Sequence, residues 1–173
     1  INALSHVRAH QDINVQGITD ADIIALHQEG GQSCVQVFFF RDGRNYGNRA
    51  FFPSQSRYVE SPELLAAFIG QFYDRVTPPK LILLSDKVAE SALLSEALSV
   101  RADRTVRLET PQRGARRKLI DYARQNARDA LSRRMAESAS HRQLLESLAD
   151  TLGLDAPPSR IEVYDNSHIQ GTN

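Results

Sequence analysis

The chain has 173 residues, of which 41% are hydrophobic and 24% are charged, and its 21 basic and 21 acidic side chains cancel at pH 7. This balance indicates one globular domain of ordinary size and argues against a uniformly basic nucleic-acid-binding protein. No apolar run approaches the roughly 18 residues that cross a bilayer, and the first ten residues have no signal-peptide pattern, so we expect a cytoplasmic protein without membrane contact.

Three β-type runs open the predicted domain, at residues 23–26, 34–40 and 48–52, and Pro53 ends the third. Asp42-Gly43, between the second and third runs, predicts a two-residue hairpin because a type I′ turn needs positive φ angles that glycine accepts freely. Glu29-Gly30-Gly31 marks the first turn. We therefore predict a three-stranded antiparallel meander.

The middle run carries three consecutive phenylalanines, Phe38 to Phe40. An exposed patch for a partner is one interpretation, but a central strand covered on both faces is commoner for such a run. Cys34 lies in the same run, and we expect it to pack in the core. As the single cysteine, it excludes an intramolecular disulfide and a cysteine-based zinc cluster.

Helices and strands alternate after the meander. A helix is predicted over residues 61–74, with Ser61 as N-cap and Pro62 as the first helical residue. Its expected buried face consists of Leu64, Leu65, Phe68 and Phe72. The continuous apolar run in residues 80–86 predicts a buried parallel strand.

The rest of the predicted domain is mostly helical. We expect a helix over residues 90–98, a fifth strand over 105–110, and helix over 112–152 with a break near 138–140 and an end at Gly153. The resulting order, β-β-β-α-β-α-β-α, predicts an α/β fold with a mixed sheet and matches the ribonuclease H-like fold.

Positive charge is concentrated in residues 104–134, which contain ten Lys or Arg against three acids, or about +7. On a helix, three of these arginines lie within about 40° of one another beside an apolar stripe, as a row that can follow a phosphate backbone. The alternative is a solvated face paired with Asp121 and Asp129. The candidate DNA-backbone-binding residues are Arg113, Arg116, Arg117, Lys118, Arg124 and Arg128.

A last β-type run, residues 160–165, ends in an acid, Asp165. A carboxylate at a strand end is a candidate metal ligand, but a nuclease site for divalent metal ions needs several carboxylates. His168 lies three residues later and is a weaker candidate for the same site. The five histidines have no cysteine partner pattern that would predict a zinc site.

Three stretches of the chain carry a family resemblance. They are YDNSHIQGT at 164–172, HQEGGQSCVQVFFFRDGRNYGNRAFFP at 27–53 and ETPQRGARRKLIDYARQNA at 109–127. Together they resemble the UvrC family of bacterial nucleotide excision repair. The resemblance implies that Asp165 is the first Mg²⁺- or Mn²⁺-binding carboxylate of the C-terminal nuclease domain, with the other carboxylates beyond Asn173. It also implies that the parent protein incises damaged double-stranded DNA on both sides of a lesion and has UvrB as a partner.

The same resemblance divides the chain into three parts. Residues 1–17 would be the end of the UvrB-binding helical segment, residues 18–156 a ribonuclease H-like domain, and residues 157–173 the start of the nuclease domain. The first strand of the central part has no carboxylate in its body, since Asp20 and Asp22 precede it. We therefore expect a catalytically silent copy that binds no metal of its own.

Two alternatives remain open. Asp22, Asp86 and Asp165 would together serve an active metal-dependent nuclease, whereas we interpret Asp86 as a turn or cap residue. The third possibility is a protein-interaction scaffold that contacts only UvrB or the adjacent nuclease domain.

Overall fold

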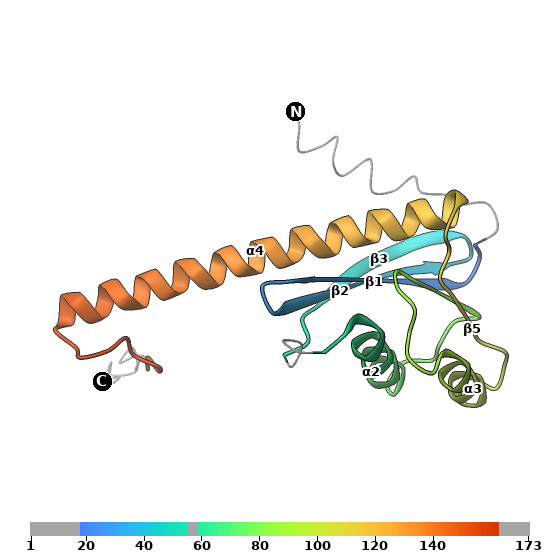
Figure 1. Ribbon diagram of the computed structural model, residues 1–173, viewed down its shortest axis with the longest axis horizontal. Helices are drawn as coiled ribbons and strands as arrows, with labels where there is room; N and C mark the ends of the chain where they lie inside the picture. Colours follow the sequence, from blue (N-terminus) through green and yellow to red (C-terminus); the bar gives the residue numbers. More distant parts are fainter. Residues whose placement is uncertain (1–17, 55–58, 163–173) are drawn as a thin grey trace, which may run out of the picture. The chain divides into compact units, whose positions relative to one another are not determined.

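A computed structural model describes residues 18–54 and 59–162 of the chain (Figure 1). The elements follow the predicted order. They are β1 (Ala21–Glu29), β2 (Gln32–Arg41), β3 (Arg44–Phe51), α2 (Ser61–Tyr73), β4 (Leu81–Leu84), α3 (Ser91–Ala102), β5 (Arg107–Glu109) and α4 (Gly114–Leu152). The chain falls into two compact units, one up to Arg133 and one from Arg134 onward, and α4 contributes to both.

One five-stranded mixed sheet has the order β3-β2-β1-β4-β5. β1 and β3 pair antiparallel with β2, and β4 joins β1 and β5 in parallel. The register places Ile24 of β1 opposite Leu84, the last residue of β4. The predicted meander and the buried parallel strand are thus confirmed.

Two-residue turns connect the three antiparallel strands. Asp42 and Gly43 both have positive φ angles, 50° and 73°, as the predicted type I′ turn requires. Gly30 and Gly31 do the same between β1 and β2. The Gly43 N–H also donates to the Thr19 carbonyl at 2.9 Å, which ties the second turn to the entry of β1.

Each face of the sheet is covered by helices (Figure 1). Because side chains alternate along a strand, Ile24 and Leu26 of β1 pack with α2 and α3, whereas Ile23 and Ala25 pack under α4. Full burial of such an aliphatic side chain stabilises the fold by roughly 1.5–3 kcal/mol. The first half of α4 contributes Leu119, Ile120 and Ala123 to its layer.

The interior position of β2, between β3 and β1, explains its phenylalanines. Phe38 and Phe40 are buried on the α4 side, and Phe39 packs against Phe72 on the other side. Cys34 is fully buried. A strand covered on both faces is therefore confirmed, and the exposed-patch alternative is wrong.

The start of α2 differs from the prediction. Glu60, not Ser61, is the N-cap, and no side chain caps the helix. The Ser61 hydroxyl instead donates to the Gln28 side chain at 2.8 Å, a partner 33 residues away. The buried residues of α2 are Leu64, Leu65, Ile69 and Tyr73, while Phe68 and Phe72 are half-buried.

The long helix α4 runs from Gly114 to Leu152 without the break predicted near residues 138–140. Serine and alanine are tolerated in a helix interior, and neither glycine nor proline interrupts this sequence after its first residue. The helix ends as predicted at Gly153, whose φ is 64°, and the Leu154 N–H donates back to the Ala149 carbonyl at 2.9 Å.

Other boundaries shift by a few residues. α3 extends to Ala102, and β5 is limited to three residues. Residues 160–162 are not part of a strand, and the remainder of the predicted strand, residues 163–165, lies outside the described residues. None of the helices found in the described ranges has the length and apolar character that a membrane crossing needs.

Candidate nucleic-acid interface and the buried acids

The candidate metal ligand Asp165 and its neighbour His168 lie outside the described residues. The six candidate DNA-contacting residues are all described, and they cluster at the start of α4 and along its first half. The apolar stripe predicted beside them is confirmed, since Leu119, Ala123, Ala127 and Ala130 are buried. The helix is therefore anchored with its polar side outward.

Three of the six cations are held by acids of the same domain. Arg116 donates to Glu109 at 2.5 Å and Arg117 to Asp121 at 2.8 Å. Arg124 donates to both carboxylate oxygens of Asp86, at 2.8 and 2.9 Å. The predicted row of three arginines is thus two paired residues and one unpaired residue.

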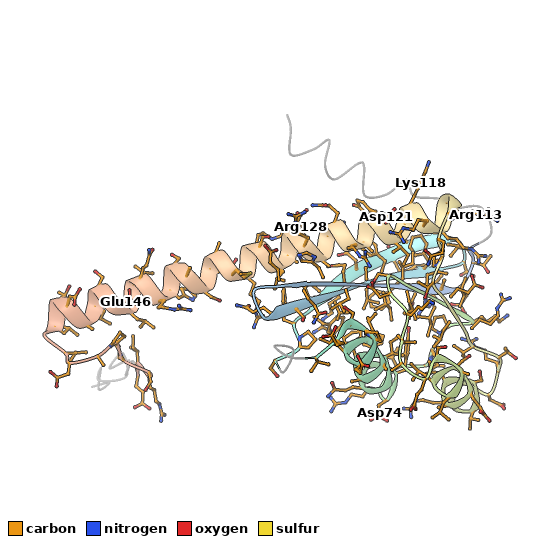
Figure 2. The ribbon with its side chains drawn as sticks, viewed as in Figure 1. Asp74, Arg113, Lys118, Asp121, Arg128 and Glu146 are labelled. Carbon is orange, nitrogen blue, oxygen red and sulfur yellow. The ribbon has the colours of Figure 1, made fainter. Side chains whose placement is uncertain are left out.

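The other three candidates are exposed. They are Arg113, Lys118 and Arg128, which Figure 2 labels. None of them forms an ion pair with a side chain in residues 18–54 and 59–162. Lys118 points away from the strands in that view. Lys87, next to Asp86, is equally exposed, and sequence reasoning missed it because a lone lysine gives no pattern. These four side chains are available to bind phosphate groups.

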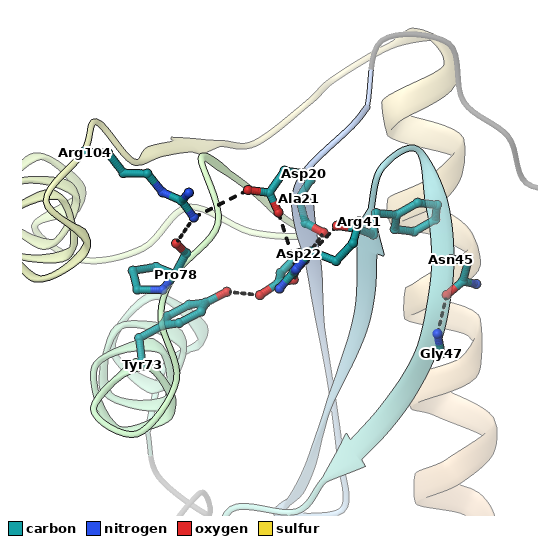
Figure 3. Close-up of polar contacts among 10 residues, drawn as sticks. Asp20, Ala21, Asp22, Arg41, Asn45, Gly47, Tyr73, Pro78 and Arg104 are labelled. Carbon is teal, nitrogen blue, oxygen red and sulfur yellow. Dashed lines mark hydrogen bonds and ion pairs between the residues drawn. The ribbon is translucent and has the colours of Figure 1, made fainter.

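A second polar cluster surrounds Asp22, which is fully buried within β1 (Figure 3). The prediction that Asp22 precedes the strand is therefore wrong. Its two carboxylate oxygens accept from Arg41 Nη1 and from the Tyr73 hydroxyl, each at 2.7 Å. The same Arg41 nitrogen donates to the carbonyl of Phe40 at 2.7 Å.

Burial dominates the ionisation of this cluster. It raises the pKa of the Asp22 carboxyl, although the hydrogen bonds from Arg41 and Tyr73 oppose the rise. Burial, with the neighbouring Asp22, raises the pKa of the Tyr73 hydroxyl well above its usual value. Burial alone would lower the pKa of Arg41. The hydrogen bond to Asp22 and the charge of that carboxylate outweigh burial, so the pKa of Arg41 is raised overall and the guanidinium stays cationic.

Asp20 connects this cluster to its surroundings. Its two oxygens lie 3.4 Å from Arg41 Nε and 3.5 Å from Arg104 Nη2. Arg104 also donates to the Pro78 carbonyl at 2.8 Å (Figure 3). The entry of β1 is thus tied to the β2–β3 hairpin and to the segment before β5.

Asp86 lies two residues beyond β4 and is also occupied. Besides the two bonds from Arg124, it accepts a hydrogen bond from the Ser85 hydroxyl at 2.8 Å. That hydroxyl accepts from the Leu26 N–H at 2.9 Å, which joins β1 to the end of β4. Asp86 is a turn residue that fixes α4 against the sheet, in agreement with its interpretation from the sequence.

The two acids do not converge. Asp22 lies opposite Ile82 in the register, so Asp86 is four residues further along, or about 13 Å at the rise of a strand. Continuing the register past Ile24 and Leu84 puts Leu26 level with Asp86. These residues do not fit a Mg²⁺ ion, which needs several free oxygen ligands around one centre. No group of three metal-ligating side chains occurs in the part of the chain that the structure describes.

Sequence reasoning missed Arg41 and Tyr73 as partners of Asp22. Arg41 offered a weak signal, because it faces β1 across a predicted antiparallel pairing, where opposite charges are favourable. Tyr73 is 51 residues away in the sequence and offered none.

The family model described as UvrC Ribonuclease H-like domain matches residues 20–134. That span covers all five strands, both shorter helices and the first half of α4. The match shows the ribonuclease H-like fold that the element order predicts.

Curated relatives are similar over nearly the whole chain. The UvrABC system protein C of Chelativorans sp. (strain BNC1) is 58% identical over 171 residues, which are 99% of this chain and 26% of that protein. Those of Brucella abortus (strain 2308) and Paramagnetospirillum magneticum are 55% and 54% identical, over 99% and 100% of this chain and 28% of each protein. The chain thus spans about a quarter of the length of these relatives.

Among solved structures, the crystal structure of human ENDOV is similar with a TM-score of 0.31 and 12% identity. The similarity covers 66% of this chain and 62% of that one.

Proposed function

Because the chain belongs to the UvrC family, we propose that it is the central, non-cleaving ribonuclease H-like domain of a nucleotide excision repair endonuclease subunit. The whole subunit incises damaged DNA on both sides of a lesion in the cytoplasm. The domain contributes a rigid platform and contacts to the DNA backbone.

Among the described residues, the β1 side chain level with Asp86 is not a carboxylate, which supports the non-cleaving role. The neighbouring β1 position is occupied by Leu26, and Asp86 is neutralised by Arg124. Asp22 is buried under Arg41 and Tyr73 and cannot reach a scissile phosphate. Two-metal phosphodiester hydrolysis needs carboxylates that hold both ions about 3.5–4 Å apart, and these acids cannot do so.

Exposed, unpaired cations support the DNA-contacting role. Arg113, Lys118, Arg128 and Lys87 offer positive charge without an acidic partner in the described ranges. The three ion-paired arginines contribute less to binding, because an incoming phosphate must compete with an existing carboxylate. They are Arg116, Arg117 and Arg124.

The other parts of the chain serve the neighbouring domains in this proposal. Asp165, with His168 nearby, belongs to the nuclease domain that follows, where a Mg²⁺ or Mn²⁺ ion would polarise the scissile phosphate. Residues 1–17 continue from the segment that binds UvrB. The alternative is a pure protein-interaction scaffold without DNA contact. A DNA-binding experiment distinguishes it from the proposed role.

The test is a salt titration of the 173-residue chain with a fluorescent DNA duplex. Log affinity should fall with log salt at a slope of about −0.9 per contacted phosphate. Replacing Arg113, Lys118 and Arg128 with glutamine should flatten the slope by nearly 3. The control variant loses the same charge at Arg101, Arg104 and Arg160, which have acidic partners.

A control variant that loses as much slope as the test variant would show non-specific charge attraction and remove the α4 surface from the DNA interface. No binding at about 50 mM salt would favour the scaffold. Cleavage by the chain that disappears in Asp86→Asn would refute the non-cleaving role.

A further inference from the structure

A hollow of about 670 Å³ lies between the outer edge of β3 and helix α2. Its walls are Arg49 and Phe51 from the strand and Phe68, Gly70 and Phe72 from the helix. A second hollow of similar volume, about 670 Å³, continues past Phe51 and Phe68. Both lie on the face of the sheet opposite α4, so they are separate from the cations assigned to DNA.

The strand beside the hollow is an edge strand. β3 pairs only with β2 in the sheet, and no further strand of the described residues lies beyond it. Alternate residues of such an edge direct their N–H and C=O groups outward, where another extended chain can pair with them. β3 has eight residues, from Arg44 to Phe51, enough to template a short strand.

The rim of the hollow carries uncompensated positive charge. Asp74 is the acid among its lining residues, and Arg101 pairs with it through a 3.4 Å contact. Arg49 and Arg75 have no ion-pair partner within residues 18–54 and 59–162. β3 itself contains Arg44 and Arg49 and no acid. A ligand at this edge should therefore be anionic.

The aromatic rings are already engaged with one another. Phe68 stacks on Phe72 with ring centroids 5.6 Å apart, and Phe51 meets both rings at an edge-to-face angle. Arg49 lies over the Phe51 ring at 5.0 Å from its centroid. A nucleobase needs an open ring face for stacking, so this arrangement favours aliphatic or aromatic side chains that fill space rather than single-stranded nucleic acid.

We propose that the outer edge of β3 binds an extended, acidic peptide segment of a partner protein. The segment adds a sixth strand to the sheet, places an apolar side chain in the hollow and sets its carboxylates against Arg49 and Arg75. The interaction surface is independent of the DNA-contacting role, because it uses other residues on the other face of the sheet.

Gly70 gives a clean way to block the hollow. A Cβ added there would meet no atom within 4 Å, and the residue is helical, so the side chain of Gly70→Leu begins in open space beside the hollow and causes no backbone strain. Leucine also has a higher helix propensity than glycine, so the substitution favours the helix. The matched control is Ala97→Leu, which adds similar apolar volume at an exposed position of α3.

The experiment measures fluorescence anisotropy of a labelled octapeptide with threonine at every second position. The positions between the threonines, which share one face of a strand, are alternately glutamate and leucine or phenylalanine. The chain and Ala97→Leu should bind it, Gly70→Leu about tenfold or more weaker, and Arg49→Glu with Arg75→Glu weaker still. N-methylation of alternate peptide nitrogens should abolish binding, and amide exchange in residues 44–51 should slow on binding.

Equal binding by Gly70→Leu, no binding at millimolar peptide, or unchanged exchange in β3 would overturn the proposal. Displacement of the peptide by a thymidine oligonucleotide that itself loses affinity in Gly70→Leu would also overturn it and assign the hollow to nucleic acid instead.

Discussion

At the scale of single residues, Asp22 makes the stability of the domain depend on pH. Its carboxyl is fully buried, and burial raises its pKa above the ordinary value of 3.8. A raised folded-state pKa means that the folded chain holds this proton more tightly than the unfolded chain does. The contribution of Asp22 to stability is therefore fully present below pH 3.8 and is lost as pH rises through the raised pKa.

The matching variant is Asp22→Asn, which keeps the shape of the neutral acid and replaces one accepting oxygen with a donating amide nitrogen. We expect the excess unfolding free energy of the wild type over Asp22→Asn to shrink as pH rises above about 4, measured by urea denaturation. Glu96→Gln, an exposed change on α3, corrects for the general effect of removing a carboxyl group. An excess that grows with pH would mean that the Arg41 ion pair outweighs burial and lowers the pKa.

Arg124 and Arg128 differ in role although they lie one helical turn apart. Arg124 makes three hydrogen bonds to Asp86 and the Ser85 carbonyl, whereas Arg128 makes no ion pair among the described residues. We expect Arg124→Gln to lower the free energy of unfolding by about 1 kcal/mol. Arg128→Gln should leave stability unchanged and weaken only DNA binding, so equal thermal stability of the two variants would contradict this division.

The sequence predicted the positions of these side chains on the helix but not their partners. The spacing of Arg117, Arg124 and Arg128 correctly placed them on one flank of a helix beside a buried stripe. It did not reveal that Asp86, 38 residues away, would hold Arg124. Likewise, an acid such as Asp22 at the start of an apolar run is typical of a strand boundary. Its burial inside β1 could not be predicted, because it depends on Arg41 and Tyr73, which only the tertiary fold brings close.

At the scale of elements, local chemistry determined most of what could be predicted. The Asp42-Gly43 turn, the alternation of apolar residues and Gly153 at the helix end are local signals, and each is confirmed. The cap of α2 and the continuity of α4 were predicted wrongly. Ser61 has a distant partner in Gln28, and the serines near residue 139 weaken a helix without ending it.

The chain divides into its two compact units within α4, and a proline in each part of this helix tests whether the units unfold independently. A proline at position 139 removes a backbone donor from the helix interior and costs about 3 kcal/mol locally. Since residue 139 belongs to the unit from Arg134 onward, we expect Ala139→Pro to reduce helicity by circular dichroism while leaving the amide-exchange protection of β1 and β2 unchanged. Ala123→Pro, at a fully buried position under the sheet, should unfold the first unit. Lost protection of β1 in Ala139→Pro would show that the units unfold together.

At the scale of the whole molecule, the resemblance at Asp165 leads to a separable defect. The proposed function makes Asp165 a metal-binding carboxylate of one nuclease centre. In the full-length protein, Asp165→Ala should then abolish one of the two incisions around a lesion, the 5′ one by the family resemblance. Asp86→Asn should spare both, since Asp86 serves a structural ion pair. Incision mapping on a duplex with a single defined lesion reads both outcomes, and equal loss of both cuts in Asp165→Ala would refute the assignment.

The pair of two-residue turns also bears on how the sheet is assembled. Strands β1, β2 and β3 are contiguous in sequence from Ala21 to Phe51, so each hairpin closes a very short loop. Hairpins of this kind form in about 1–10 μs, whereas parallel pairing of β4 with β1 must wait for a helix-containing crossover. During synthesis the meander precedes the rest of the sheet in the chain. The antiparallel half thus serves as the template onto which β4 and then β5 are added, with the inner edge of β1 left open until they arrive.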